Sequence, residues 1–317
     1  MKQMKVKLED VCERGTSNLK QSDIAKTSGD YPIYGASGYI GNTNFYHQEK
    51  PYVAVVKDGA GVGRAALYPA NSSVIGTMQY LLPKDNVLPK YLFYVVSYMH
   101  LEKYFTGATI PHIYFKDYKN EEFNLDLLER QAEIVEILEK CEKIIEKRKQ
   151  EIQLLDQLIK ARFVEMFGDP VSNSRGLPEA TLPELGEFGR GVSKHRPRND
   201  PKLLGGKYPL IQTGDVASAD LYITSYTGTY SDLGLAQSKM WDEGTLCITI
   251  AANIAKTAIL GFDACFPDSV VGFRANEKTN NIYIHYWFSF FQRILEAQAP
   301  ESAQKNINLK SLSELRV

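Results

Sequence analysis

The sequence predicts an α+β protein in which two tandem domains of mixed β-sheet with short helices are joined by one long α-helix of the coiled-coil type. Three observations predict this fold. The two ends of the chain carry the same signals in the same order, a heptad pattern lies between them, and short β-branched runs bounded by turn residues recur at both ends. We place the domain boundaries at 1–123, 124–168 and 169–317.

The internal repeat is followed through matched positions along the two halves. Each half contains a Gly-x-Tyr-Pro sequence, beginning at Gly29 and at Gly206, where we expect a turn. A β-branched run follows, and it ends in a small-residue turn and a cation. The matched positions are Leu8 and Leu182, 174 apart; Gly29 and Gly206, 177 apart; Arg64 and Lys256, 192 apart; Gly76 and Gly272, 196 apart; and His112 and Asn306, 194 apart.

Short apolar runs predict the strands and helices of both domains. We expect strands at 52–56, 65–68, 80–82, 246–250 and 257–260. One apolar helix is expected in each domain, at 89–104 and at 282–295.

The central helix is predicted over 127–167, because its apolar positions step by four and three without interruption. Asp126 with Glu129 resembles a capping box, and Gly168 followed by Asp169-Pro170 ends the helix. The expected coiled-coil contacts are Ile134, Leu138, Ile145, Ile152, Leu155, Ile159 and Met166. Such a helix is ~60 Å long, close to ~18 base pairs of duplex. It could hold two domains on one DNA duplex, or it could be a dimerisation coil.

Composition predicts an ordinary globular chain. A length of 317 residues with 44% hydrophobic content suffices for a core in each of two domains. No apolar run approaches the roughly 20 residues of a membrane span, so we expect no membrane partner and a cytoplasmic location. The four cysteines lack metal-ligand spacing, and we expect them to be buried thiols.

Charge is distributed unevenly. Residues 1–120 hold 14 basic and 10 acidic residues, 121–170 hold 8 and 13, and 171–317 hold 15 and 15, which gives +4, −5 and 0. The net charge of −1 therefore reflects the acidic helix and does not exclude basic faces on the domains.

No catalytic, metal or cofactor constellation is found in the sequence. The glycines of 57–64 follow a strand, but no helix follows them, so we expect a tight hairpin and not a phosphate-binding loop. The histidines are scattered without zinc spacing, and Pro267-Asp268 lacks the Glu-x-Lys that a nuclease would need. The chain is predicted to be non-enzymatic.

The remaining polar residues suit DNA binding. Lys194 to Arg198 is a short basic run able to contact phosphates, or a solvated surface loop. Amide and hydroxyl side chains recur at turn tips, where Gln and Asn can pair with adenine edges or serve ordinary turn chemistry. The candidates are Ser37, Lys57, Arg64, Thr77, Gln79, Lys194, Arg196, Arg198, Gln212, Thr213, Asn253 and Lys256.

Several segments resemble the specificity subunits of type I restriction-modification enzymes. They are Phe163-Val164-Glu165-Met166-Phe167-Gly168-Asp169-Pro170 at the junction, Pro111-His112-Ile113 through Arg130-Gln131 before the helix, and Gln304 to Lys310 in the second half. The resemblance implies two target-recognition domains, each reading one half of a split target in double-stranded DNA. It further implies a helix that sets their spacing and docks methyltransferase subunits, with a restriction and translocation subunit as a further partner.

The resemblance also implies a distal helix after the second domain, antiparallel to the central one. The sequence ends at Val317, so we expect the central stripe to need another cover, such as a second copy of the chain. The main interpretation is a DNA-recognition subunit that directs DNA methylation or cleavage. The alternatives are a truncated scaffold or assembly inhibitor that binds partner subunits through the helix, and a stand-alone nuclease or methyltransferase.

Overall fold

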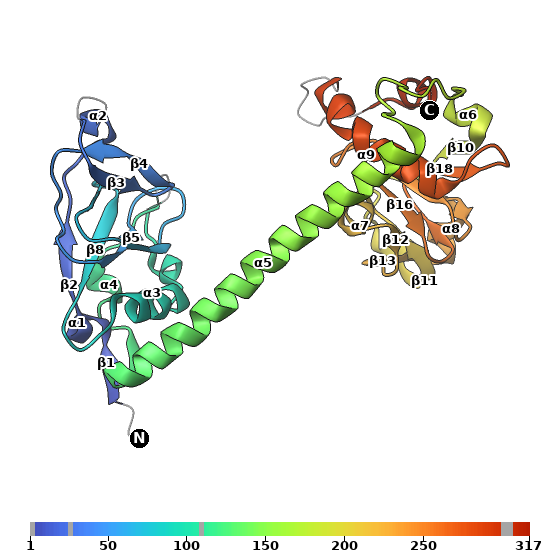
Figure 1. Cartoon of the computed structure of the whole chain (residues 1–317). Coiled ribbons are helices and arrows are strands. Elements are labelled where there is room, and N and C mark those ends of the chain that lie inside the picture. Colours follow the sequence, from blue (N-terminus) through green and yellow to red (C-terminus); the bar gives the residue numbers. More distant parts are fainter. Residues whose placement is uncertain (1–3, 25–27, 108–110, 299–306) are drawn as a thin grey trace. The chain divides into compact units, whose positions relative to one another are not determined.

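A computed structural model describes residues 4–24, 28–107, 111–298 and 307–317. The chain divides into two compact units, Met1–Gln150 and Glu151–Val317, and the division falls inside the long helix (Figure 1). Each unit has its own buried core, around Val53 and Leu81 in the first and around Leu246 and Phe273 in the second. The expected matches at residues 304–306, including Asn306, lie outside the described residues.

The N-terminal unit is built on an antiparallel sheet of strand order β2-β8-β5-β6 and a smaller sheet of order β4-β3-β7. A separate pair, β1 with β9, joins the start of the chain to the segment before the long helix. Helix α3 packs on β5 and β6. The elements are β1 (Met4–Lys7), α1 (Leu8–Val11), β2 (Cys12–Thr16), α2 (Gln21–Ile24), β3 (Tyr31–Gly35), β4 (Gly38–Thr43), β5 (Tyr52–Val56), β6 (Ala65–Tyr68), β7 (Ser73–Val74), β8 (Met78–Pro83), α3 (Pro89–Tyr98), η1 (Leu101–Tyr104), α4 (Phe115–Tyr118) and β9 (Glu122–Leu125).

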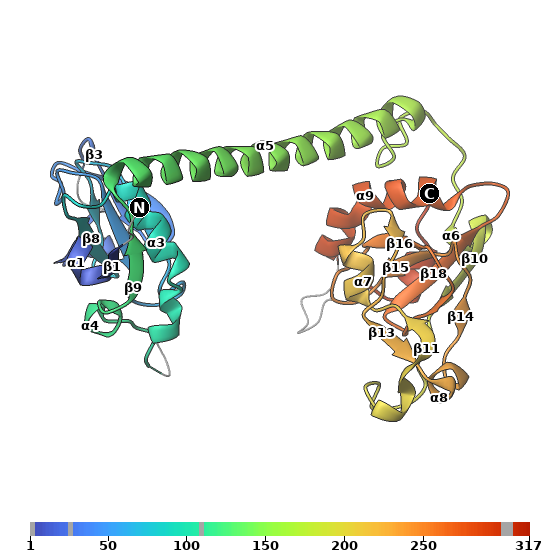
Figure 2. The same ribbon diagram turned by 90° about the horizontal axis from the view of Figure 1, so that it is seen from below.

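The C-terminal unit contains a five-stranded sheet of order β10-β18-β15-β16-β12 and a four-stranded sheet of order β13-β11-β17-β14. Helix α9 packs on the larger sheet (Figure 2). The elements are α6 (Leu182–Leu185), β10 (Gly186–Arg190), η2 (Pro201–Leu203), β11 (Leu204–Leu210), α7 (Thr213–Ser218), β12 (Tyr222–Ile223), β13 (Gly228–Tyr230), α8 (Asp232–Ala236), β14 (Met240–Trp241), β15 (Leu246–Thr249), β16 (Thr257–Leu260), β17 (Ala264–Cys265), β18 (Val270–Ala275), α9 (Asn281–Gln298) and α10 (Leu309–Ser313).

The two units share one topology, which confirms the tandem repeat. The order β2-β8-β5-β6 recurs as β10-β18-β15-β16, and the parallel pairing of β3 with β7 recurs as β11 with β17. One expected match is wrong. Gly272 lies opposite Gly189 within the sheet and so corresponds to Tyr80, which lies opposite Gly15, whereas Gly76 precedes strand β8.

The Gly-x-Tyr-Pro sequences do not form turns, contrary to expectation. The first leads into β3 and the second lies within β11. Glycine is required at both places because a neighbouring strand approaches closely. A Cβ on Gly29 would lie 2.2 Å from the carbonyl oxygen of Thr43, and one on Gly206 would lie 2.4 Å from that of Tyr230.

The glycine-rich segment 57–64 is a hairpin connection, as expected. It joins the antiparallel strands β5 and β6, and Gly59, Gly61 and Gly63 all have positive φ. The amide of Gly63 donates to the carbonyl of Val56 at 2.8 Å. Strand β6 follows directly, so the helix N-terminus of a phosphate-binding loop is absent at this place.

The long helix α5 runs from Leu128 to Phe167, one residue shorter than predicted. Gly168 ends it with φ +84°, and its amide donates to the carbonyl of Val164 at 2.8 Å. Residues 140–162 are all exposed, so the thiol of Cys141 is exposed and not buried as expected. Of the expected coiled-coil contacts, Ile134 packs on the N-terminal core, Leu138 is half-buried, and the others are exposed: Ile145, Ile152, Leu155, Ile159 and Met166.

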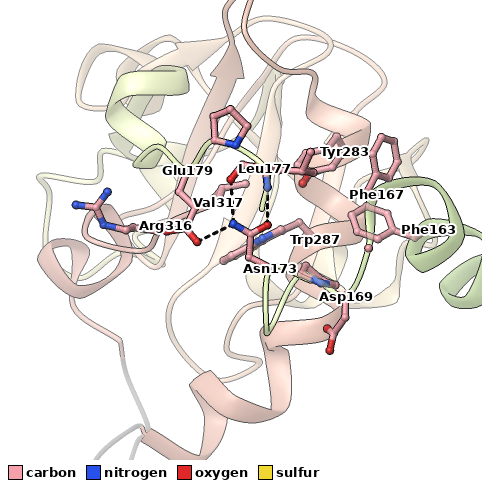
Figure 3. Close-up of a pocket in the computed structure, with 13 residues that line it drawn as sticks. Phe163, Phe167, Asp169, Asn173, Leu177, Glu179, Tyr283, Trp287, Arg316 and Val317 are labelled. Atoms are coloured by element: carbon pink, nitrogen blue, oxygen red, sulfur yellow. Dashed lines mark hydrogen bonds between the residues drawn. The ribbon is translucent and has the colours of Figure 1, made fainter. Parts of the chain in front are cut away.

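The junction motif at the end of α5 has a structural role. Phe163 is buried in the C-terminal core and stacks on Tyr283 with ring centroids 5.3 Å apart, around the small pocket in Figure 3. The carboxylate of Asp169 accepts a hydrogen bond from the backbone amide of Val171 at 2.9 Å. The side-chain amide of Asn173 donates to the carbonyl of Leu177 at 2.9 Å (Figure 3). The motif therefore fixes the helix end to the C-terminal unit.

Gln131 fixes the other end of α5 to the N-terminal unit. Its side chain is 0% exposed. The carbonyl oxygen accepts from the amide of Leu88 at 2.8 Å, and the amide donates to the carbonyls of Asn86 at 2.9 Å and Asp126 at 2.8 Å. Without Gln131 these three hydrogen bonds between the helix and the N-terminal unit would be lost.

We expect Gln131→Ala to lower the free energy of unfolding of the N-terminal unit by about 1–3 kcal/mol, because buried polar groups lose their partners. Urea denaturation measures this. The control is Gln157→Ala, which makes the same change at an exposed position of the same helix. Equal losses from the two variants would contradict the anchoring role of Gln131.

Candidate nucleic-acid interface

The N-terminal unit has a surface cleft at one end of its main sheet. The turn 75–77, which leads into β8, lies beside the segment 17–21 that follows β2, and the amide of Gly76 donates to the carbonyl of Leu19 at 2.8 Å. The polar side chains that line the cleft are Ser17, Asn18, Lys20, Gln21, Lys57 and Thr77. Two of the sequence candidates, Lys57 and Thr77, are thus brought together here.

The C-terminal unit has a cleft between the loop after β10 and the turn 267–269 that leads into β18. The polar side chains that line it are Arg198, Asn199, Gln212, Thr213, Tyr230 and Ser269. Gln212 is exposed, and its backbone amide donates to the carboxylate of Asp215 at 2.8 Å at the start of α7. Three sequence candidates therefore meet in this cleft: Arg198, Gln212 and Thr213.

The turns 75–77 and 267–269 occupy the same place in the repeated fold. The amide of Lys57 donates to the carbonyl of Thr77 at 3.0 Å, and the amide of Ile250 donates to that of Ser269 at 3.0 Å. Each turn is closed by an amide at the start of the following strand, from Met78 to the carbonyl of residue 75 and from Val270 to that of residue 267. The two clefts therefore lie beside equivalent turns, in which position 76 corresponds to position 268, while most of their other lining residues are not equivalent.

The charges of the two clefts differ. In the N-terminal cleft, Lys57 has no ion pair with the part of the chain that the structure describes. Beside the C-terminal cleft, Arg196 and Arg198 both pair with the carboxylate of Asp268, at 3.3 and 2.5 Å. Lys194 is exposed in the same loop.

The loop 194–200 is shaped by its own hydrogen bonds. Arg196 donates to the carbonyls of Ser193 at 2.6 Å and His195 at 2.8 Å. The amide of Lys202 donates to Asp200 and, together with His195, lowers the pKa of that carboxyl group. These contacts hold the basic run as a defined surface and not as a free tail.

The other candidates lie on the hairpin that follows the central strand of each sheet. Arg64 is exposed at the β5–β6 connection and donates to the carbonyl of Ala36, so it meets the β3–β4 turn that carries Ser37. Asn253 and Lys256 are exposed in the equivalent β15–β16 connection. Each unit thus presents a cleft and a hairpin tip.

Gln79 is a correction to the expected interface. It is only 5% exposed, inside β8, and its amide donates to the carbonyl of Gly15 on β2. The sequence placed it beside Thr77 at a turn tip, but strand β8 begins at Met78 and turns its side chain into the sheet. In this structure Gln79 is a structural residue and not an exposed reader of bases.

The sequence did not indicate that Asn199 lines the C-terminal cleft or that Asp268 pairs with the arginines beside it. The register of the repeat, taken from the sheet pairing, would have matched Asp268 with Gly76 and drawn attention to it.

Within the described residues no group of three or more His, Cys, Asp or Glu side chains could hold a metal ion, and no helix is long and apolar enough to cross a membrane.

The chain matches the family model of the type I restriction modification DNA specificity domain over residues 1–155 and 179–317. It therefore belongs to this family. It is a DNA-recognition subunit of a type I restriction-modification system, with two specificity domains in tandem.

A solved structure shows the same fold. The crystal structure of the type I restriction-modification system S subunit from M. genitalium is 16% identical, with a TM-score of 0.59 over 100% of this chain and 84% of that one. A structure from work on complex assembly and conformational transition of the type I R-M system is 15% identical, over 99% and 85% of the chains, with a TM-score of 0.47. The HsdS subunit from Thermoanaerobacter tengcongensis is 15% identical, over 99% and 84%, with a TM-score of 0.40.

Replacing Gln212 with Ala should relax the preference for one base pair, at about 1–3 kcal/mol of discrimination, because an exposed amide can pair with an adenine edge. Replacing Gln79 should instead cost about 1–3 kcal/mol of stability and leave base preference unchanged, because the half-buried Gly15 loses the donor to its carbonyl. Competition binding with a duplex library and urea denaturation measure the two effects. A uniform loss on all sequences from Gln212→Ala would contradict base reading.

Proposed function

We propose that each specificity domain reads one half of a bipartite target in double-stranded DNA and that the chain itself performs no chemistry. The observation that carries this proposal is the pair of clefts beside equivalent turns, each lined by at least one cation and by side chains able to pair with bases. Methylation and cleavage then belong to methyltransferase and restriction subunits. A cytoplasmic location is part of the same proposal.

The long helix sets the spacing of the two half-sites in this proposal. A helix of 40 residues is about 60 Å long, close to ~18 base pairs. Both ends are fixed by buried side chains, Gln131 in the N-terminal unit and Phe163 in the C-terminal unit. A change of helix length would therefore be transmitted to the domains.

The exposed middle of α5 is the proposed docking surface for partner subunits. The apolar side chains of α5 between residues 140 and 162 are all exposed, and each large one is worth roughly 1.5–3 kcal/mol on burial. Methyltransferase helices or the same helix of a second copy would cover them. The same surface favours the second candidate function, a scaffold or assembly inhibitor that binds subunits without reading DNA.

Exchange of residues 1–120 for the first domain of another family member should change only one half of the recognised motif, because each unit has its own core. Methylation mapping of cells that carry the hybrid with its methyltransferase subunits measures this. The reciprocal exchange of 169–317 should change the other half. If both halves change together, the two-reader proposal is wrong; if no motif exists before exchange, the scaffold function is favoured.

The purified chain should form a dimer whose fraction rises with concentration, because self-association covers the stripe. Changing Ile145 and Ile152 to Asp should abolish the dimer or cause heavy aggregation, as seen by sedimentation. Gln150 and Gln157 changed to Asp provide the control, since they add the same charge on the opposite face of the helix. A monomer at all concentrations would contradict self-pairing.

A further inference from the structure

We propose that the carboxylate of Asp268 is a built-in substitute for a DNA phosphate, which holds Arg196 and Arg198 and so weakens sequence-independent DNA binding by the C-terminal domain. This inference rests on the proposed function and adds a regulatory residue beside the same cleft. Asp268 is a positioning residue for the two arginines and contacts no base.

The geometry of the cluster matches what a phosphate would offer. Each carboxylate oxygen faces a different guanidinium: Oδ2 accepts a hydrogen bond from Nη2 of Arg196 at 3.3 Å, and Oδ1 forms an ion pair with Nη2 of Arg198 at 2.5 Å without hydrogen-bond geometry. Guanidinium groups recognise carboxylates and phosphates through the same paired N–H donors. The bonds from Arg196 to Ser193 and His195 keep that arginine in place whichever anion it meets.

The two ion pairs are weak enough for a DNA phosphate to replace the carboxylate of Asp268. The side chains of Arg196 and Arg198 are 54% and 46% exposed, and that of Asp268 is 30% exposed. Exposed ion pairs are screened by water and contribute little net stability. A DNA phosphate that enters the cleft can therefore displace the carboxylate, but only after it competes with a charge already present.

The N-terminal domain lacks this device. Gly76 occupies the equivalent turn position, and a Cβ there would lie 3.1 Å from the carbonyl oxygen of Ser17, so a larger side chain would be crowded. Lys57, one of the two cations that line that cleft, has no carboxylate beside it in this turn. The two readers therefore differ in how strongly they bind DNA regardless of sequence.

The test compares Asp268→Asn with the unmodified full chain on a labelled duplex of scrambled sequence, by fluorescence anisotropy at several salt concentrations. Loss of the charge should tighten binding about three- to tenfold at low salt, since two exposed ion pairs are released. The gain should shrink as salt rises, because it is electrostatic. Glu277→Gln is the matched control, which removes one acid at the far end of β18.

The decisive comparison is in the Arg196→Ala and Arg198→Ala background. There, Asp268→Asn should give no more than the control, because no arginine remains to be released. An equal gain with and without the arginines would overturn the proposal, and so would a gain limited to sequences with one particular base pair, which would make Asp268 a reader of cytosine. Absence of DNA binding by every variant would instead refute the proposed function itself. Thermal unfolding confirms that each variant folds.

Discussion

The antiparallel pairing of β5 with β8, repeated as β15 with β18, is the constraint on which both clefts depend. β5 and β15 are buried along their whole length, so the side chains on both faces of each strand pack against fixed neighbours. A shift of one residue would move every side chain to the wrong face and break the ladder. The turns 75–77 and 267–269 are therefore held at the same edge of each domain, and the clefts follow from the sheets and not from the loops alone.

Local chemistry made much of the fold predictable. The β5–β6 hairpin, the long helix and its left-handed stop at Gly168 depend on neighbours in the sequence, and these predictions were confirmed. Features set by distant strands were not predictable. Gly29 is required by the approach of Thr43, and the amide of Gln79 is taken by Gly15 across the sheet, so both were assigned to turns. The ion pairs of Asp268 with Arg196 and Arg198 were not predictable from local sequence either, because the partners are about 70 residues away.

Net charge conceals the electrostatics of this chain. A sum of −1 combines an acidic helix with domains in which many cations are already paired. In the C-terminal domain Lys239 pairs with Glu187 and Arg274 with Asp242. What decides DNA binding is which cations face a cleft and whether a carboxylate competes for them. The two domains share a topology, but they differ in whether a carboxylate pairs with the cations beside the cleft.

The central claim is that two domains read two separate half-sites. Methylation mapping of a genome in cells that carry this chain with its methyltransferase subunits tests it most directly. The account predicts one motif of two specified parts divided by a spacer of fixed length and arbitrary sequence. A single continuous motif, or a spacer of variable length, would contradict it.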